Sequence, residues 1–309
     1  MALLFQSSID SAERWSAELR RLLPDLEIRV WPNIGNAGDV DAALVWRPPA
    51  GLLASLPKLK LIAALGAGVD HILADPLLPA GVPIVRLVDP YMTASMSEYV
   101  QLQVLRLHRQ DPLYLAQQRE RVWRERPQPN AGERRVGVLG LGELGRDAVL
   151  KLSVLGFDVA GWGRTARRLR GIACFHGSDG LSTLLRRSEI LVCLLPLTPA
   201  TEAILDARLF AGLPRGAAIV NCARGRHLVE ADLVAALDSG QLSTAILDVF
   251  HDEPLPPHHP FWSDPRIIVT PHVAAATHAP TAAPVVADNL QRLRQGRPLL
   301  HLVDRERGY

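Results

Sequence analysis

Three polar residues in the second half of the chain have the types and positions that could reduce a carbonyl group. Arg224 follows the apolar run VNCA, Glu253 follows LDVFHD, and His272 follows VTP. Each lies at or just past a predicted strand, and the carboxyl ends of parallel strands line one crevice where ligands bind. There His272 could donate a proton and Glu253 could hold the imidazolium, while Arg224 could polarise the carbonyl and pair with a neighbouring carboxylate. Together they predict reduction of a carbonyl beside a carboxylate.

Each of these residues also has an ordinary interpretation when it is taken alone. A histidine at a strand end is more often structural, and Glu253 precedes Pro254 in what could be a surface loop. Arg224 could cap a helix. The hypothesis therefore depends on the three side chains meeting at one edge of a sheet.

The stretch Arg134–Gly145, RRVGVLGLGELG, is the element that would bind a cofactor beside them. A short apolar strand runs into Gly140, Gly142 and Gly145, and the apolar spacing of Arg146–Leu155 is helical. In a dinucleotide-binding turn these glycines allow, in order, a tight turn, the approach of a pyrophosphate and close packing of helix on strand. The phosphates would then lie at the helix N-terminus. A glycine-rich turn that binds nothing is the alternative.

The end of the next predicted strand, Asp158–Trp162, indicates which dinucleotide is bound. An acidic residue about 20 residues past the glycines usually accepts hydrogen bonds from the ribose 2′-hydroxyl. Here the chain instead has Arg164 and Thr165, followed by Arg167 and Arg168. An arginine fork and a hydroxyl would bind a 2′-phosphate that a carboxylate would repel. NADP(H) is therefore predicted over NAD(H), unless these arginines only form a solvated face.

Composition limits the class of protein. The 309 residues favour two domains, and 48% hydrophobic with 21% charged residues is ordinary for a globular protein. A net charge of +2 without a basic block argues against nucleic acid. No apolar run is long enough for a membrane span or a signal peptide. Cys174, Cys193 and Cys222 are scattered, and Cys193 and Cys222 lie in apolar runs, so these two are expected to be buried thiols of a protein in a reducing cytoplasm. The adjacent His258 and His259 lack a third ligand, so no metal site is predicted.

The apolar pattern predicts two α/β domains with parallel sheets. Short strands alternate with helical patches in residues 1–90, and strand, helix and strand repeat after residue 133. Between them, Met92–Trp123 reads as a long helix or a helix pair, and Leu102, Leu105 and Leu113 would give it an apolar stripe for a subunit interface or for plain packing. The predicted strands are Ala2–Phe5, Leu26–Trp31, Ala42–Trp46, Leu59–Leu65, Ile84–Val88, Asp158–Trp162, Glu189–Leu195, Ala217–Cys222, Thr244–Phe250 and Ile267–Thr270.

Six segments of the chain resemble the D-isomer-specific 2-hydroxyacid dehydrogenases. ARG, the DVF…EPLP run and TPH, in this order and spacing, form a highly specific signature, and the matching segments run through most of the chain. Within the family, GWGRTARR and HDEPLPPHHPFW resemble its branch of glyoxylate and hydroxypyruvate reductases. The matching segments are Gly66–Asp70, Val136–Gly145, Leu194–Thr201, Asn221–Leu237, Leu247–Pro256 and Thr270–Thr277.

The resemblance implies a fold, an assembly and a set of roles. A Rossmann cofactor domain, residues 99–275, would be inserted in a flavodoxin-like substrate domain of residues 1–98 and 276–309, and the protein would be a homodimer. Arg224 would bind substrate, Glu253 would support His272, and His272 would be the acid and base. Substrate would also contact Trp46 and the backbone of Ala67, Gly68 and Val69. From the sequence alone, that loop could equally be an ordinary tight turn. The cofactor would contact Gly140, Gly142, Glu143, Leu144, Gly145, Trp162, Arg164, Thr165, Leu195, Pro196, Thr201, Cys222, Ala223, Asp248 and His272, with Asp248 holding the carboxamide of the nicotinamide.

The predicted activity is NADPH-dependent reduction of a small 2-oxo acid, such as glyoxylate or hydroxypyruvate, to the 2-hydroxy acid. One alternative is an NAD-linked D-2-hydroxyacid dehydrogenase that acts on a larger acid. Another is a cofactor-sensing interaction protein without useful turnover. A pure binding module needs no proton donor, so the joint presence of Arg224, Glu253 and His272 favours an enzyme.

Overall fold

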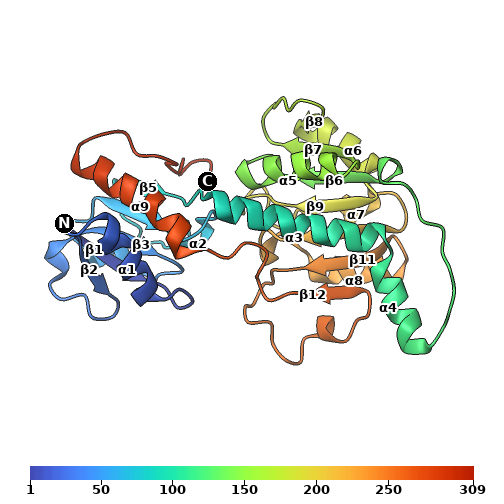
Figure 1. Ribbon diagram of the computed structural model, residues 1–309, viewed down its shortest axis with the longest axis horizontal. Coiled ribbons are helices and arrows are strands. Elements are labelled where there is room, and N and C mark those ends of the chain that lie inside the picture. Colours follow the sequence, from blue (N-terminus) through green and yellow to red (C-terminus); the bar gives the residue numbers. More distant parts are fainter. The chain divides into compact units, whose positions relative to one another are not determined.

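The computed structural model describes residues 1–309, which form two compact units. Unit 1 comprises Met1–Met92 and Thr277–Tyr309, and unit 2 comprises Thr93–Ala276 (Figure 1). The first junction lies within helix α3 (Pro90–His108), so the predicted boundary after residue 98 falls inside a continuous helix rather than in a linker. Unit 1 is thus built from both ends of the chain around an inserted unit 2.

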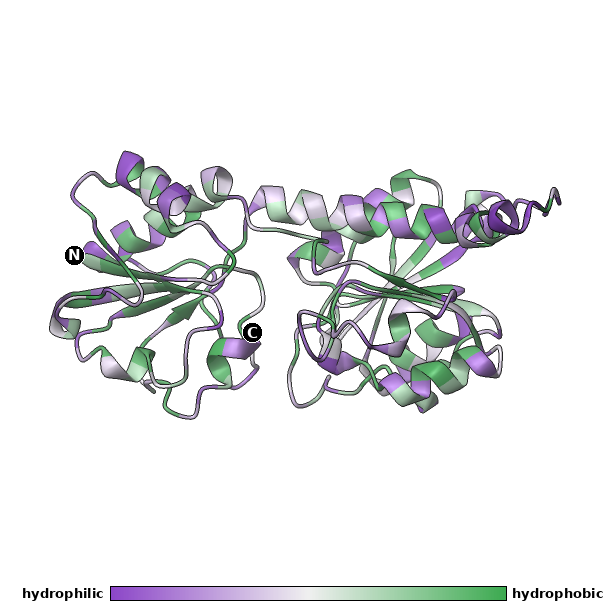
Figure 2. Ribbon diagram, turned by 90° about the horizontal axis from the view of Figure 1, so that it is seen from below, coloured by the Kyte–Doolittle hydropathy of each residue, from purple (hydrophilic) through white to green (hydrophobic).

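The sheet of unit 1 is entirely parallel, with the strand order β2-β1-β3-β4-β5. This is the flavodoxin-like order, which reverses direction between β1 and β3. Its strands are short and mostly apolar (Figure 2), and β1, β3 and β4 are buried almost throughout. The strands are β1 (Ala2–Gln6), β2 (Glu27–Val30), β3 (Val40–Val45), β4 (Leu61–Ala64) and β5 (Ile84–Val85).

Two helices from opposite ends of the chain pack on each other in unit 1. Helix α1 (Ala12–Leu22) begins after Ser11, whose hydroxyl accepts from the Arg14 N–H at 3.3 Å, and it buries Trp15 and Leu19. Helix α9 (Ala279–Arg294) lies against α1 and buries a stripe of alanine, valine and leucine side chains. The short helices of the unit are α2 (Asp70–Leu73) and the 3₁₀ helices η1 (Ala37–Asp39) and η2 (Leu53–Ser55).

The sheet of unit 2 has seven parallel strands in the order β12-β11-β10-β9-β6-β7-β8. It is the Rossmann order with one further strand, and it reverses direction between β6 and β9. The two sheets confirm the predicted fold class. The strands are β6 (Arg135–Leu139), β7 (Asp158–Gly163), β8 (Ala173–His176), β9 (Ile190–Cys193), β10 (Ala217–Asn221), β11 (Leu242–Leu247) and β12 (Ile267–Val269).

Successive strand residues of unit 2 contribute to two different cores, because side chains alternate between the faces of a sheet. Ile219 of β10 packs with helices α6 (Gly177–Arg187), α7 and α8, whereas its neighbour Val220 packs with α3 and α5. Figure 1 shows α3 running across the sheet of this unit. The remaining helices are α5 (Glu143–Val154), α7 (Ala207–Ala211), α8 (Glu230–Asp238) and the 3₁₀ helices η3 (Ala131–Glu133), η4 (Gly225–His227) and η5 (Pro260–Trp262).

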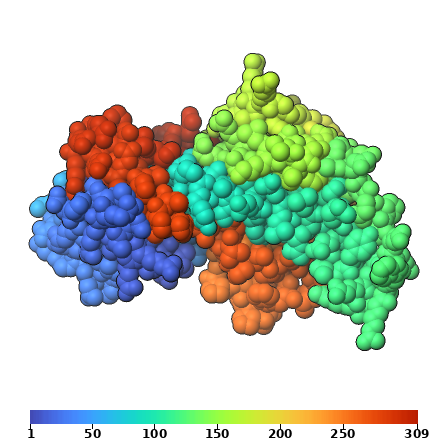
Figure 3. Space-filling view, in the orientation of Figure 1, coloured from blue at the N-terminus to red at the C-terminus, as the bar shows by residue number.

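The predicted long helical segment is a helix pair. Helix α3 ends at His108, and α4 (Asp111–Glu120) starts after Gln110, which adopts a left-handed conformation with φ of 58°. Figure 3 shows both helices on the surface of unit 2. Leu102 and Leu105 of the predicted stripe are 53% and 38% exposed. No helix in the structure is both long enough and apolar enough to cross a membrane.

Candidate active site

The glycine turn between β6 and α5 has the geometry of a phosphate cradle. Gly140 adopts φ of +99°, and a Cβ on Gly145 would lie 1.8 Å from the Gly140 carbonyl oxygen, so neither position accepts a side chain. A Cβ on Gly142, by contrast, would meet nothing within 4 Å, so the chain is open to a ligand there. Helix α5 begins at Glu143, and its N-cap Gly142 provides no side chain to cap the first turn. The turn therefore fits a pyrophosphate at a helix N-terminus.

The end of β7 lies directly beside this turn. The Gly140 N–H donates to the Trp162 carbonyl at 2.8 Å, and the Trp162 indole donates to the Gly177 carbonyl at 2.8 Å. Arg164 and Thr165 follow, and both are exposed. The strand ends without an acidic residue. Because β7 is the neighbour of β6, the predicted 2′-phosphate ligands Arg164 and Thr165 follow the strand next to the one that leads into the glycine turn.

The loop after β9 is joined to the loop after β10 by a buried histidine. His227 is 0% exposed, and its Nδ1 lies 3.1 Å from the Arg224 carbonyl while its Nε2 lies 3.3 Å from the Pro196 carbonyl. The Asn221 amide also donates to the Arg224 carbonyl, at 3.0 Å. The Thr201 hydroxyl donates to the Pro196 carbonyl at 2.6 Å. These bonds fix the backbone around Arg224, whose own guanidinium donates to the Ala223 carbonyl at 2.7 Å.

A single glycine sets the spacing between the loop of Arg224 and the loop after β11. A Cβ on Gly225 would lie 1.9 Å from the carbonyl carbon of Phe250, which is closer than any side chain could approach. Backbone therefore packs on backbone here. The contact places the loop of Arg224 against the segment that leads to Glu253.

Glu253 and His272 form a hydrogen-bonded pair at the same sheet edge. Nδ1 of His272 lies 2.9 Å from Oε2 of Glu253, and the other carboxylate oxygen accepts from the Phe250 N–H at 3.1 Å. Their side chains are 32% and 15% exposed, respectively. Because Glu253 takes Nδ1, Nε2 is the ring nitrogen that remains for a substrate. The pair has the arrangement of a proton donor oriented by a carboxylate.

His272 itself is held in an unusual backbone conformation by Asp248. Its φ is 54°, in the left-handed region that L-residues other than glycine seldom adopt, and its N–H donates to the Asp248 carbonyl at 2.8 Å. The Asp248 carboxylate accepts from the Thr270 hydroxyl at 2.7 Å and from the N–H groups of Val273 and Ala274, both at 2.9 Å. Burial raises the pKa of Asp248, against the effect of these three donors.

These bonds give Asp248 a second role that the sequence did not suggest. Its contact with the nicotinamide carboxamide stays a prediction, whereas in the structure the residue is 1% exposed and its carboxylate binds the loop of His272. Cys222 is likewise buried, and burial raises the pKa of its thiol and raises that of Cys193 to about 12. A cofactor contact at Cys222 would therefore have to use the backbone. The prediction that these two thiols are buried is confirmed.

The residues predicted to hold the substrate carboxylate lie in unit 1. Trp46 follows β3, and a Cβ on Gly66 would lie 2.7 Å from its ring, so Gly66 allows the indole to cover the loop after β4. The Trp46 ring also lies 4.5 Å from the His71 ring, centroid to centroid. Arg47 adopts φ of 45°, which bends the chain sharply after Trp46. The loop of Ala67, Gly68 and Val69 leads into α2, and Val69 is its N-cap.

Four residues of the unit 2 network were not predicted from sequence: Tyr99, Asn221, His227 and Thr270. Asn221 and His227 lie within the matched NCARGRHLVE segment, so a polar side chain at a strand end was the available signal. Tyr99 had none, because it contacts Thr270 across 171 residues of sequence. No group of three or more His, Cys, Asp or Glu residues is arranged to hold a metal ion.

A Rossmann sheet with an open glycine turn and a histidine–carboxylate pair at one edge defines a dinucleotide-binding oxidoreductase. The model of the family described as D-isomer specific 2-hydroxyacid dehydrogenase, NAD binding domain, matches residues 102–274. The chain belongs to the D-isomer-specific 2-hydroxyacid dehydrogenase family.

Relatives match over the whole length of both chains. Glyoxylate/hydroxypyruvate reductase A of Yersinia enterocolitica is 43% identical and that of Serratia proteamaculans is 42% identical, each over 100% of both chains. A D-isomer specific 2-hydroxyacid dehydrogenase from Xanthobacter autotrophicus, crystallised with NADPH and MES, is 45% identical with a TM-score of 0.96, and 100% of this chain matches 99% of that one. A glyoxylate/hydroxypyruvate reductase from Sinorhizobium meliloti, crystallised with NADP and sulfate, is 39% identical with a TM-score of 0.93 over 100% of both chains.

Proposed function

We propose that this protein reduces small 2-oxo acids, glyoxylate and hydroxypyruvate, to 2-hydroxy acids with a hydride from NADPH. The observation that carries the proposal is the 2.9 Å contact between His272 Nδ1 and Glu253 Oε2 at the sheet edge that also carries Arg224 and the glycine turn. Relatives named glyoxylate/hydroxypyruvate reductase A, 43% and 42% identical over their full length, support the substrate class.

The residues of unit 2 divide the work of a carbonyl reduction. Bound NADPH supplies the hydride. His272 donates the proton from Nε2 to the carbonyl oxygen, and Glu253 stabilises the positive imidazolium from the Nδ1 side. Arg224 polarises the carbonyl and pairs with the substrate carboxylate. In unit 1, the loop Ala67–Val69 offers backbone N–H groups that suit a carboxylate, and the Trp46 ring lies beside Gly66 at the start of this loop.

NADP(H) is the cofactor on two independent grounds. Strand β7 ends without the carboxylate that would bind a ribose 2′-hydroxyl, and Arg164 and Thr165 stand there instead. The related structures from Xanthobacter autotrophicus and Sinorhizobium meliloti contain NADPH and NADP. These grounds argue against an NAD-linked enzyme. Unit 2 is accordingly proposed as the NADP-binding domain and unit 1 as the substrate-binding domain.

The proposal is tested by following the loss of reduced-nicotinamide absorbance with a panel of 2-oxo acids and each cofactor. The wild-type protein is expected to reduce glyoxylate and hydroxypyruvate with NADPH. His272→Ala is expected to lower kcat by about 100- to 10,000-fold with NADPH affinity retained, because only the proton donor is removed. His259→Ala serves as the control, since that histidine pairs with Glu230 outside the site. Near-normal turnover of His272→Ala would overturn the mechanism.

The cofactor preference is tested at Arg164. Arg164→Ala should raise KM for NADPH by about 10- to 100-fold, because a charge-assisted hydrogen bond to the 2′-phosphate is lost. KM for NADH should change little, since NADH has no such phosphate. Arg186→Ala, which removes an exposed arginine bound to Thr183 on α6, is the matched control. Equal effects on both cofactors would show that Arg164 is only a surface residue.

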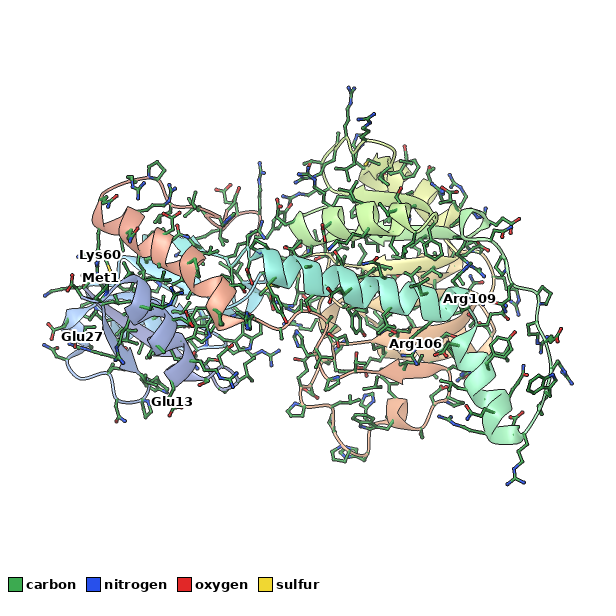
Figure 4. All side chains as sticks on the ribbon, viewed as in Figure 1. Met1, Glu13, Glu27, Lys60, Arg106 and Arg109 are labelled. Atoms are coloured by element: carbon green, nitrogen blue, oxygen red, sulfur yellow. The ribbon has the colours of Figure 1, made fainter.

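We also propose how the protein assembles and where in the cell it lies. The exposed Leu102 and Leu105 of α3, together with Trp123 at 96% exposure, support a homodimer through the α3–α4 segment. Figure 4 labels Arg106 near the end of α3 and Arg109 directly after it. Sedimentation over a range of concentrations checks the dimer, and a monomer throughout would contradict it. The three free cysteines support a cytoplasmic location, which cell fractionation can check.

A further inference from the structure

The segment that carries His272 is fixed from one side by helix α3. Two α3 side chains bond to it: the Tyr99 hydroxyl lies 2.7 Å from the Thr270 hydroxyl, and the Ser95 hydroxyl donates to the Ala274 carbonyl at 3.3 Å. Met96 of α3 and Ala274 also belong to the same buried cluster. Helix α3 is rigid because it buries Val100 and Val104 against the sheet of unit 2. It is therefore a fixed reference for the segment Thr270–Ala274.

The directions of the hydrogen bonds in this network follow from the acceptor at its end. The Asp248 carboxylate accepts from three donors, which are the Thr270 hydroxyl and the N–H groups of Val273 and Ala274. Thr270 must then donate its one hydroxyl proton to Asp248, at 2.7 Å. The Thr270 oxygen consequently accepts from Tyr99. The chain runs in one direction, from the Tyr99 phenol through Thr270 to Asp248.

The proton of Tyr99 is available for this donation. The side chain is 9% exposed, and burial raises the pKa of the phenol, so the hydroxyl stays protonated at neutral pH. Hydrogen bonds in such a chain polarise one another, and each strengthens the next. The last acceptor, Asp248, binds the Thr270 side chain before His272 and the backbone N–H groups of His272, Val273 and Ala274.

We propose that Tyr99 is a positioning residue for the acid/base His272, acting through Thr270 and Asp248. Tyr99 touches neither Glu253 nor His272; it fixes Thr270, which orients the Asp248 carboxylate, and that carboxylate holds the N–H groups of Val273 and Ala274. These bonds keep His272 in its left-handed conformation with Nδ1 on Glu253. The expected effect of Tyr99 on turnover rests on the proposed function, whereas its effect on the His272 backbone does not.

The test is Tyr99→Phe, which removes one oxygen and keeps the ring that packs in the core. We expect kcat to fall about 5- to 10-fold, because a single neutral hydrogen bond to the network is lost. KM for NADPH should stay within about twofold, since the glycine turn is untouched. Tyr114→Phe on α4 is the matched control, because that hydroxyl accepts only from Arg126 and Gln128 in the segment after α4.

A double-mutant cycle decides whether Tyr99 acts through Thr270. Thr270→Val breaks the chain and should lower kcat more than Tyr99→Phe, whereas Thr270→Ser keeps the hydroxyl and should retain most of the activity. The Tyr99→Phe, Thr270→Val double variant should lose no more than Thr270→Val alone, because the pathway is already broken. Additive losses in the double variant would overturn the proposal.

Hydrogen exchange tests the same inference without any turnover. The amides of His272, Val273 and Ala274 bind Asp248, so their exchange should accelerate in Tyr99→Phe and remain unchanged in Tyr114→Phe. If the wild-type protein reduces no 2-oxo acid, the proposed function fails, yet exchange still decides the role of Tyr99. Wild-type exchange at these amides in Tyr99→Phe would overturn it.

Discussion

At the scale of single residues, the feature with the greatest chemical consequence is the backbone of His272. A left-handed conformation costs a residue other than glycine roughly 1–2 kcal/mol, so it persists only where the surroundings impose it. Here Asp248 accepts four bonds from Thr270–Ala274, one of them through its own carbonyl. The strain is thus balanced by a dedicated buried carboxylate. The result is an imidazole with one nitrogen on Glu253 and the other available.

Glu253→Gln tests the charge of the supporting carboxylate separately from its shape. The amide oxygen can still accept from His272 Nδ1, but it cannot stabilise the positive imidazolium. We expect kcat to fall about 10- to 100-fold, with smaller changes in KM for NADPH. Steady-state kinetics measure this effect.

A second histidine–glutamate pair provides the control for that variant. His259 Nε2 lies 3.3 Å from Glu230 Oε2, in the loop before η5, and it contacts no residue of the site. Glu230→Gln should leave kcat within about twofold of wild type. A similar loss in both variants would mean that Glu253 acts on stability rather than on His272.

At the scale of elements, the site is built by loops that contact one another in the order of their strands. The end of β7 bonds to the glycine turn, and a Cβ on Gly140 would lie 2.6 Å from the Leu194 carbonyl after β9. His227 joins the loop after β9 to the one after β10. Gly225 and Asp248 continue the series to β11 and β12. The sheet order therefore sets which functional groups can meet.

Gly225→Ala should break this series at one point. The added methyl group would lie 1.9 Å from the Phe250 backbone, so the two loops must separate. We expect a loss of about 1–3 kcal/mol in the free energy of unfolding and a fall of more than about tenfold in kcat/KM. Gly132→Ala, whose Cβ would meet only the Gly156 carbonyl at an ordinary 3.7 Å, should change neither. Denaturant unfolding and steady-state kinetics report the two quantities.

Elements with a strong local signal could be predicted from the sequence. Strands β9 and β10 are continuous apolar runs, and helix α8 is followed by Gly240, a residue type that favours the left-handed conformation found there, with φ of 71°. Strand β8 was not predicted, because ACFH is short, lies at the edge of the sheet and is only half-buried. The break between α3 and α4 was also left open, since Gln110 is not a residue type that marks a left-handed turn.

The residues of the candidate site also divide into those with a local sequence signal and those without one. Glycine spacing and polar residues at strand ends are local features, and they pointed to the turn and to Arg224, Glu253 and His272. The partners of Asp248 depend on how a loop folds over a strand end, and the contact of Tyr99 depends on where α3 packs. Such long-range contacts leave no periodic mark in the sequence, so the structure was needed to find them.

At the scale of the whole molecule, acid stability depends on carboxylates bound to cations. In unit 2, Arg266 donates to Asp264 through Nε at 2.9 Å and through Nη2 at 2.7 Å. These side-chain bonds hold the pKa of Asp264 below its ordinary value of 3.8. Its stabilising effect is therefore complete above the unfolded-state pKa, and it is lost as pH falls through the lower folded-state pKa.

Asp264→Asn should expose this dependence. At neutral pH we expect Tm to fall by about 2 °C, because the charged bonds to Arg266 are lost. The difference from wild type should shrink as pH falls below the ordinary carboxyl pKa of 3.8, and it should vanish once pH lies below the lowered folded-state pKa, where Asp264 is protonated in both states of the wild-type protein. Thermal denaturation across pH measures both, with Asp25→Asn, in the exposed turn after α1, as the control. A difference that persists in acid would contradict the explanation.

The division of unit 1 between the two ends of the chain has a consequence for synthesis on the ribosome. Strands β1 to β5 emerge first, but α9, which packs on α1, emerges last, and β5 also bridges to Leu302. Unit 2 is a continuous segment, so it can fold while translation is still in progress. The earliest-made strands must instead wait for the final residues, with their apolar surfaces uncovered. A released chain that ends at Ala276 should therefore contain a protease-resistant unit 2 and a protease-sensitive N-terminal segment.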